Sequence, residues 1–201
     1  MIQAPDNRRL VEEAQNGDRE AFRRIYECYG PRVYNFLCRL LGSRHEAEDA
    51  TQQTFLIALH RLGSLRDPKL LESWIYRIAR NEVYQKFRRK QVDSLEEDSL
   101  KPFAEKAEYR HLDGQPEKTL LNEELKEALK SALDELPLKL REVFILAVMD
   151  EMSYKDISEI VGRSLLSVKT DIYRARLMAK DKLSRYIASS KRISVRKSGE
   201  R

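Results

Sequence analysis

The sequence has few turn-forming residues and no long apolar run. Glycine occurs 7 times and proline 6 times in 201 residues, which argues against a turn-rich β architecture. No apolar stretch approaches the roughly 18 residues that a membrane span needs, and the N-terminus lacks the apolar core of a signal peptide. These absences favour a helix-rich protein that is not inserted in a membrane, and we expect a cytoplasmic location.

Motifs for metal binding and catalysis are also missing. Cys28 and Cys38 form no CxxC pair and the three histidines are scattered, so we expect buried cysteines, no metal site and no cofactor. His45 beside Glu46 and Asp49 could suggest a metal hydrolase, but no second ligand motif, P-loop or nucleophile elbow accompanies them. An enzyme is therefore the least favoured class of function.

Charge is distributed unevenly along the chain. Lysine and arginine number 38 against 33 aspartates and glutamates, a net charge of +5. Residues 163–201 hold 12 basic and 3 acidic residues, and residues 72–90 hold 6 basic and 2 acidic residues. Residues 91–118 are instead acidic, with 8 acidic and 4 basic residues. The two cationic segments imply an anionic partner, either nucleic acid or a membrane surface.

Apolar residues recur at helical spacing on both sides of the acidic segment, which predicts an all-α protein with two small helical domains. We expect a helical bundle over residues 1–90, a flexible acidic linker over 91–118, a second domain over 119–188 and a frayed basic tail over 189–201. Asp18, Ser43 and Asp67 are predicted to cap helices, and Gly30-Pro31 is predicted to break one. Phe55 and Leu59 are placed on the inner face of one helix.

The segment Met152–Lys182 has the pattern of a helix-turn-helix. Ser153 can cap the first helix, Gly162 supplies the left-handed residue of a sharp turn, and Ser164 can cap the second helix. Apolar residues recur along that second helix at Leu165, Val168, Ile172 and Leu177. The opposite face carries Lys169, Thr170, Tyr173, Arg174 and Arg176. This layout favours a helix that enters a DNA major groove, and the alternative is a helical hairpin with a solvated charged face.

A second cationic helix precedes the acidic segment. Its outer face carries Arg77, Arg80, Asn81 and Tyr84, and it ends in a basic run at Lys90. Cations interleaved with aromatic residues and an amide suit nucleic acid, because charge holds phosphates and flat groups stack on bases. A solvated basic helix end, favoured by the helix dipole, explains the segment equally well.

Three stretches together resemble the sigma-70 family of transcription initiation factors, in its compact extracytoplasmic-function form. They are Glu46–Leu59, Ser73–Lys90 and Leu133–Arg176, within a resemblance that runs from about Asp18 to Tyr186. The resemblance implies a non-catalytic protein that binds core RNA polymerase and promoter DNA, with an anti-sigma factor as a further partner. A stand-alone helix-turn-helix regulator is the alternative, but it leaves the first two matches as accidents.

The resemblance also implies roles for individual residues. Docking on polymerase is expected of Asp49, Gln52, Gln53 and Phe55. Binding of the minus-ten element is expected of Arg66, Arg77, Arg80, Asn81, Lys86, Arg88 and Arg89. Binding of the minus-thirty-five element is expected of Lys169, Thr170, Tyr173, Arg174 and Arg176. Asp171 stands where relatives often have arginine, so it either alters base preference or faces an arginine within its own domain.

Overall fold

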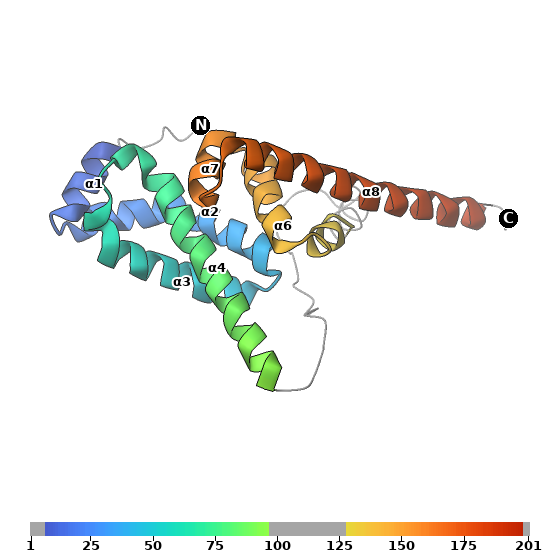
Figure 1. Cartoon of the computed structure of the whole chain (residues 1–201), viewed down its shortest axis with the longest axis horizontal. Helices are drawn as coiled ribbons and strands as arrows, with labels where there is room; N and C mark the ends of the chain where they lie inside the picture. The colour runs from blue at the N-terminus through green and yellow to red at the C-terminus, as the bar shows by residue number, and fades with distance from the viewer. Residues whose placement is uncertain (1–6, 97–127, 199–201) are drawn as a thin grey trace.

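The computed structural model describes residues 7–96 and 128–198, and every regular element in these ranges is helical (Figure 1). The first half contains α1 (Asn7–Gln15), α2 (Arg19–Leu41), α3 (Arg44–Arg61), the 3-10 turns η1 (Leu62–Ser64) and η2 (Pro68–Leu70), and α4 (Leu71–Glu96). The second half contains helical turns over 128–134, α6 (Leu138–Phe144), the π-helical turn η3 (Ile145–Met149), α7 (Tyr154–Val161) and α8 (Leu165–Ser198). The all-α prediction is confirmed.

Most helix ends follow local capping chemistry that the sequence shows. The Asp18 carboxylate accepts from the Glu20 amide at 2.8 Å, and the Ser43 hydroxyl accepts from the Glu46 amide at 3.4 Å. Asp67 caps η2, which leads directly into α4. These short-range bonds satisfy amides that have no partner inside the helix, and the three predicted caps are confirmed.

The predicted break at Gly30-Pro31 is wrong, because α2 runs without interruption from Arg19 to Leu41 with Pro31 inside it. Proline in a helix interior costs about 3 kcal/mol. Beyond it, Val33, Phe36 and Leu37 are fully buried, and each buried side chain of this size contributes about 1.5–3 kcal/mol. Packing of the second half of the helix therefore outweighs the local cost of the proline.

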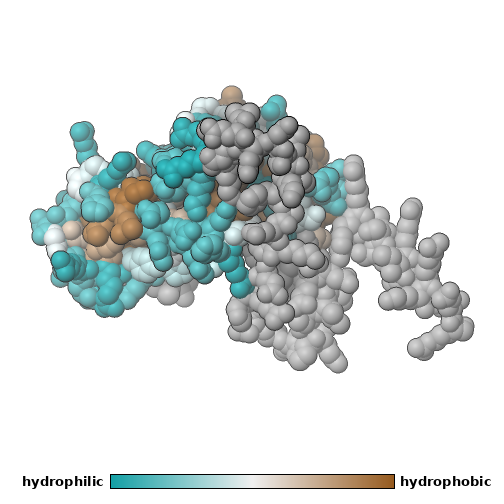
Figure 2. All heavy atoms as spheres, turned by 90° about the horizontal axis from the view of Figure 1, so that it is seen from below, coloured by the Kyte–Doolittle hydropathy of each residue, from teal (hydrophilic) through white to brown (hydrophobic). Residues whose placement is uncertain are grey.

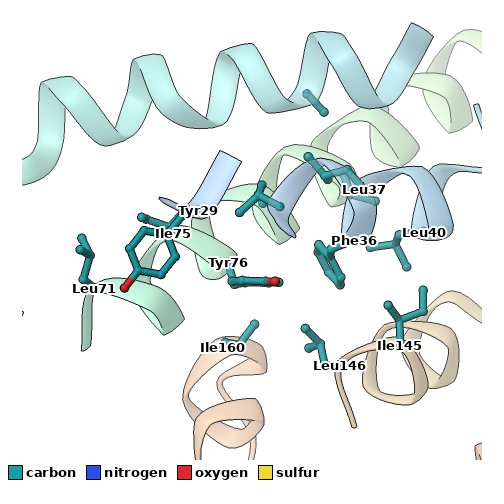
Figure 3. Close-up of a cluster of buried hydrophobic side chains, with 14 of the residues drawn as sticks. Tyr29, Phe36, Leu37, Leu40, Leu71, Ile75, Tyr76, Ile145, Leu146 and Ile160 are labelled. Atoms are coloured by element: carbon teal, nitrogen blue, oxygen red, sulfur yellow. The ribbon is translucent and has the colours of Figure 1, made fainter. Parts of the chain in front are cut away.

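One hydrophobic cluster spans both halves of the chain. Figure 3 shows Leu146 and Ile160 from the second half pointing toward Phe36 and Tyr76 from the first, and all four are at most 1% exposed. The Phe36 and Tyr76 rings lie 5.3 Å apart between centroids. Helices α4 and α7 pack against each other across this junction. The two predicted domains thus share a core, which helical periodicity alone did not indicate.

Two helices extend beyond their predicted ends. Helix α4 continues to Glu96, six residues into the segment expected to be a linker. Helix α8 continues to Ser198 and projects past the rest of the chain in Figure 1, so residues 189–198 of the predicted basic tail continue this helix. No glycine or proline interrupts residues 71–96 or 165–197, which leaves helix formation unopposed. The rest of the predicted linker and residues 119–127 lie outside the described ranges.

Two features are absent from residues 7–96 and 128–198. No helix there is both long and apolar enough to cross a membrane. No cluster of histidine, cysteine, aspartate and glutamate suitable for a metal ion occurs among those residues.

Candidate nucleic-acid interface

Helix α3 presents a mixed polar and apolar surface to solvent. Asp49, Gln52 and Gln53, which are expected to dock on polymerase, are exposed and lie on one side of the helix. Leu56 and Leu59 continue the same side and are 50% and 48% exposed. Figure 2 shows hydrophobic side chains gathered among hydrophilic ones on the face seen from below, toward the end of the molecule where α3 runs.

Phe55 of α3 lies on the inner side that helical spacing predicts, away from the other expected docking residues, whereas Leu59 lies on the opposite side from the one predicted. Phe55 is only 4% exposed and meets the Tyr26 ring edge-on, at 4.8 Å between centroids. Its ring therefore supports the exposed surface from inside and does not stand beside Asp49 and Gln52. Leu59, placed inside by sequence, is outside. Consecutive residues of a helix are about 100° apart around its axis. Near the boundary of a helix face, therefore, only the packed neighbours decide which side chain is buried.

The helix-turn-helix is built as its sequence indicates. The Ser153 hydroxyl accepts from the Asp156 amide at 3.2 Å, and Gly162 closes α7 with φ of 66° in the left-handed region. The Ser164 hydroxyl accepts from the Ser167 amide at 3.3 Å at the start of α8. The three predicted caps are confirmed, and they fix the angle at which α8 leaves the turn.

The buried face of α8 differs from the predicted one. Its buried residues are Val168, Asp171, Ile172, Ala175 and Ala179. Leu165 and Leu177, which were expected on that face, are 44% and 57% exposed. The small side chains at 175 and 179 let α8 approach α6 closely, and the larger leucines remain outside because they lie further round the helix.

All five residues proposed to read DNA from α8 are exposed to solvent, namely Lys169, Thr170, Tyr173, Arg174 and Arg176. Asp171, which raised two possibilities, is 4% exposed and pairs with Arg163 in the turn and with Lys139 on α6, the latter at 3.3 Å. It faces an arginine of its own domain, so its carboxylate is not presented to a nucleic acid. Because Asp171 is paired and buried, this acidic side chain does not interrupt the cationic surface on the first turns of α8.

Helix α4 and the loop before it expose most of the residues that are expected to bind the minus-ten element. Arg66 is exposed between η1 and η2, and the exposed residues on α4 are Arg77, Asn81, Arg88 and Arg89. Lys86 is half-buried, and its ammonium donates to the Glu46 carbonyl at 3.2 Å, across to α3.

Arg80 is the residue of this set whose position was not expected. Its Nε donates to the Glu142 carboxylate of α6 at 2.9 Å, and its guanidinium lies 4.2 Å from the centre of the Tyr84 ring. Glu142 is fully buried and also accepts from Arg163 at 2.6 Å. Burial raises the pKa of the Tyr84 phenol to about 12. Arg80 thus joins the two halves of the chain here and is not presented as a free donor.

Comparison with known proteins identifies two regions of one family. Sigma-70 region 2 matches residues 25–92, and Sigma-70 region 4 matches residues 126–178. The ECF RNA polymerase sigma factor SigW of Bacillus subtilis (strain 168) is 31% identical over 172 residues, covering 84% of this chain and 92% of the relative. The chain belongs to the ECF RNA polymerase sigma factors. Promoter recognition in transcription initiation is the function of this family, and the stand-alone regulator is not favoured.

Further similarities agree with this assignment. The ECF RNA polymerase sigma-E factor of Haemophilus influenzae is 28% identical, covering 91% of this sigma factor and 98% of the relative. The fold resembles that of the sigma factor RpoE solved in complex with the anti-sigma factor NepR from Bartonella quintana, with a TM-score of 0.66 and 26% identity. That alignment covers 81% of this sigma factor and 96% of the solved chain.

Sequence reasoning missed two features of these surfaces. Leu56 on α3 received no role, although its position three residues after Gln53 could have indicated a shared face. Glu142 was not singled out because an isolated glutamate in a helix gives no sign that it is buried. Only its two arginine partners in the folded sigma factor explain it.

Proposed function

We propose that this sigma factor binds core RNA polymerase through α3, and positions it on promoters by reading duplex DNA with α8 and the opened minus-ten region with α4. The observation that carries this proposal is the exposed face of α8 in a capped helix-turn-helix. There, five residues with hydrogen-bonding groups, three of them cationic, stand opposite a buried face that is apolar except for Asp171. A helix of this construction fits the major groove, where its donors reach base edges and phosphates. The mechanism is binding, without catalysis, in the cytoplasm where polymerase and DNA meet.

The α3 surface suits a protein partner better than DNA. Asp49 would repel phosphates, whereas a carboxylate and two amides beside Leu56 and Leu59 combine hydrogen bonding with apolar area. Protein interfaces typically contain an apolar centre surrounded by polar groups that fix the register. This composition supports α3 as the docking surface for polymerase.

The minus-ten surface comprises the exposed residues of α4 and the preceding loop. Arg77 and Asn81 lie four residues apart on one side of α4 and can donate to bases or phosphates, while Arg88 and Arg89 add charge further along. Arg80 can join them only after leaving Glu142, which requires the two halves of the chain to separate. An anti-sigma factor is a further proposed partner, since the structurally similar RpoE was solved with one.

The proposal is tested by pull-down of core RNA polymerase and by run-off transcription from a supercoiled template. We expect the parent protein to retain polymerase and to give a defined transcript. Asp49→Lys should lose polymerase retention, whereas Glu27→Lys, which reverses an exposed carboxylate on α2, should retain it. Joint replacement of Lys169 and Arg174 by alanine should keep polymerase binding and lose the promoter-dependent transcript. Failure of the parent to join polymerase would refute the proposal.

A further inference from the structure

The outer face of α8 carries an apolar ridge among its cations. Leu166 is 76% exposed, Tyr173 is 68% exposed and Leu177 is 57% exposed. With Thr170 between them, they follow one another at intervals of four, three and four residues, which places them in a line along the helix. This line lies opposite the buried side chains. The face therefore offers apolar contact area in addition to hydrogen-bond donors.

Leu166 occupies the position in this ridge that is closest to the turn. It is the second residue of α8, two positions after the Ser164 cap, and in a helix-turn-helix the first residues of the second helix contact base edges. The Thr170 hydroxyl donates to the Leu166 carbonyl at 3.0 Å, so that donor is used within the helix. The start of the reading helix thus presents hydrocarbon where a donor would be expected.

The surroundings of the ridge point to DNA as its partner. Lys169 and Arg176 flank it on one side and Arg174 flanks it on the other, and all three are exposed. These cations match a phosphate backbone. A leucine has no group that can read hydrogen-bond patterns, and the thymine 5-methyl group is the apolar feature that base edges present in the major groove.

We propose that Leu166 determines base preference in the upstream promoter element by contacting the 5-methyl group of a thymine, with Tyr173 extending the apolar contact. This inference rests on the proposed function, since it requires α8 to read duplex DNA. It adds to that function the kind of base that α8 prefers, namely one that carries a 5-methyl group. An amphipathic helix of a protein partner is the competing occupant of the same ridge.

The test uses the complex of this sigma factor with core RNA polymerase. Selection from duplexes with a randomised upstream element first identifies the preferred site. Each thymine of that site is then replaced by deoxyuridine, which lacks only the methyl group. We expect the parent complex to bind about fourfold more weakly at one such position, the factor that corresponds to one buried methyl group. The Leu166→Ala complex should bind the two duplexes equally.

Leu177→Ala is the matched control, because Leu177 is also exposed but lies eleven residues, roughly 16 Å, further along the helix. It should keep the parent's discrimination between thymine and deoxyuridine. Equal binding of all duplexes by the parent complex would overturn the inference, as would methyl discrimination that survives in Leu166→Ala. Loss of a protein partner in Leu166→Ala with unchanged DNA discrimination would overturn it in favour of the competing occupant.

Failure of the proposed function gives a different result. In that case the selection enriches no site, and replacement of Lys169 and Arg174 by alanine leaves DNA binding by the complex unchanged. Enrichment of a site whose recognition is insensitive to methyl groups would refute the role of Leu166 alone.

Discussion

Replacement of the buried Glu142 by glutamine should destabilise this sigma factor strongly. The carboxylate is fully buried and accepts from Arg80 on α4 at 2.9 Å and from Arg163 in the turn at 2.6 Å. Glutamine preserves the volume and one acceptor oxygen but removes the negative charge. Two guanidinium groups, each less than one-fifth exposed, are then deprived of the charge that compensates their burial.

Removal of one partner from a buried ion pair costs about 3–5 kcal/mol, because the remaining charge is left without compensation. Here Arg163 keeps its ion pair with Asp171, and both arginines retain some access to water. We therefore expect the free energy of unfolding to fall by about 3 kcal/mol, which is near the lower end of this range. That is a large fraction of the 5–15 kcal/mol by which a typical protein is stable.

The measurement is urea unfolding followed by circular dichroism. Glu27→Gln is the control, since Glu27 pairs with Arg23 on the exposed side of α2 and its replacement should leave the unfolding midpoint unchanged. Arg80→Met combined with Glu142→Gln should cost less than the sum of the two single changes, by about 1 kcal/mol or more. A Glu142→Gln protein as stable as the control would refute this account of the junction between the halves.

Three further outcomes are expected. Gly162→Ala should lower the free energy of unfolding by about 1–2 kcal/mol, measured in urea, because φ of 66° disfavours a side chain although the space around it is open. The free energy of unfolding should fall as pH rises from 10 through 12, because burial raises the pKa of Tyr84 to about 12 and a hydrogen bond with the Cys38 thiol raises the pKa of Tyr34 to about 12. Tyrosinate absorbance and unfolding measurements across this pH range check it. Joint replacement of Arg88 and Arg89 by alanine should reduce the salt dependence of promoter binding by the polymerase complex, with a slope smaller by about 1 for each phosphate that these arginines neutralise.

Each of these outcomes has its own check. Gly63→Ala, where the space is equally open and φ is not positive, should be neutral, and equal costs at both glycines would contradict the backbone argument. The sign of the pH effect follows from folded-state pKa values above the ordinary value of 10, since the native protein then holds protons that the unfolded chain releases. Unchanged stability up to pH 12 would contradict it. Arg24→Ala on α2 should leave the salt slope unchanged, and an unchanged slope without Arg88 and Arg89 would exclude them from phosphate binding.

Local chemistry made much of this sigma factor predictable from its residues. The Ser153 cap, the left-handed Gly162 and the Ser164 cap act within a few residues of one another, so the helix-turn-helix is encoded where it forms. Hydrophobic periodicity likewise indicated helices throughout, and the exposed cations of α8 followed from it. The residues expected to bind polymerase and promoter stay predictions until they are tested, and so do the domain boundaries.

The sequence by itself determined the helical class, the caps, the turn and the cationic faces, because all of these depend on neighbours within about one or two helical turns. Only the tertiary structure decided that Leu59 is exposed, that α2 continues through Pro31, and that Arg80 binds Glu142. The last two residues are 62 positions apart. Pairs at such separation form only when the helices pack, and packing energy then overrides preferences that a local pattern can show.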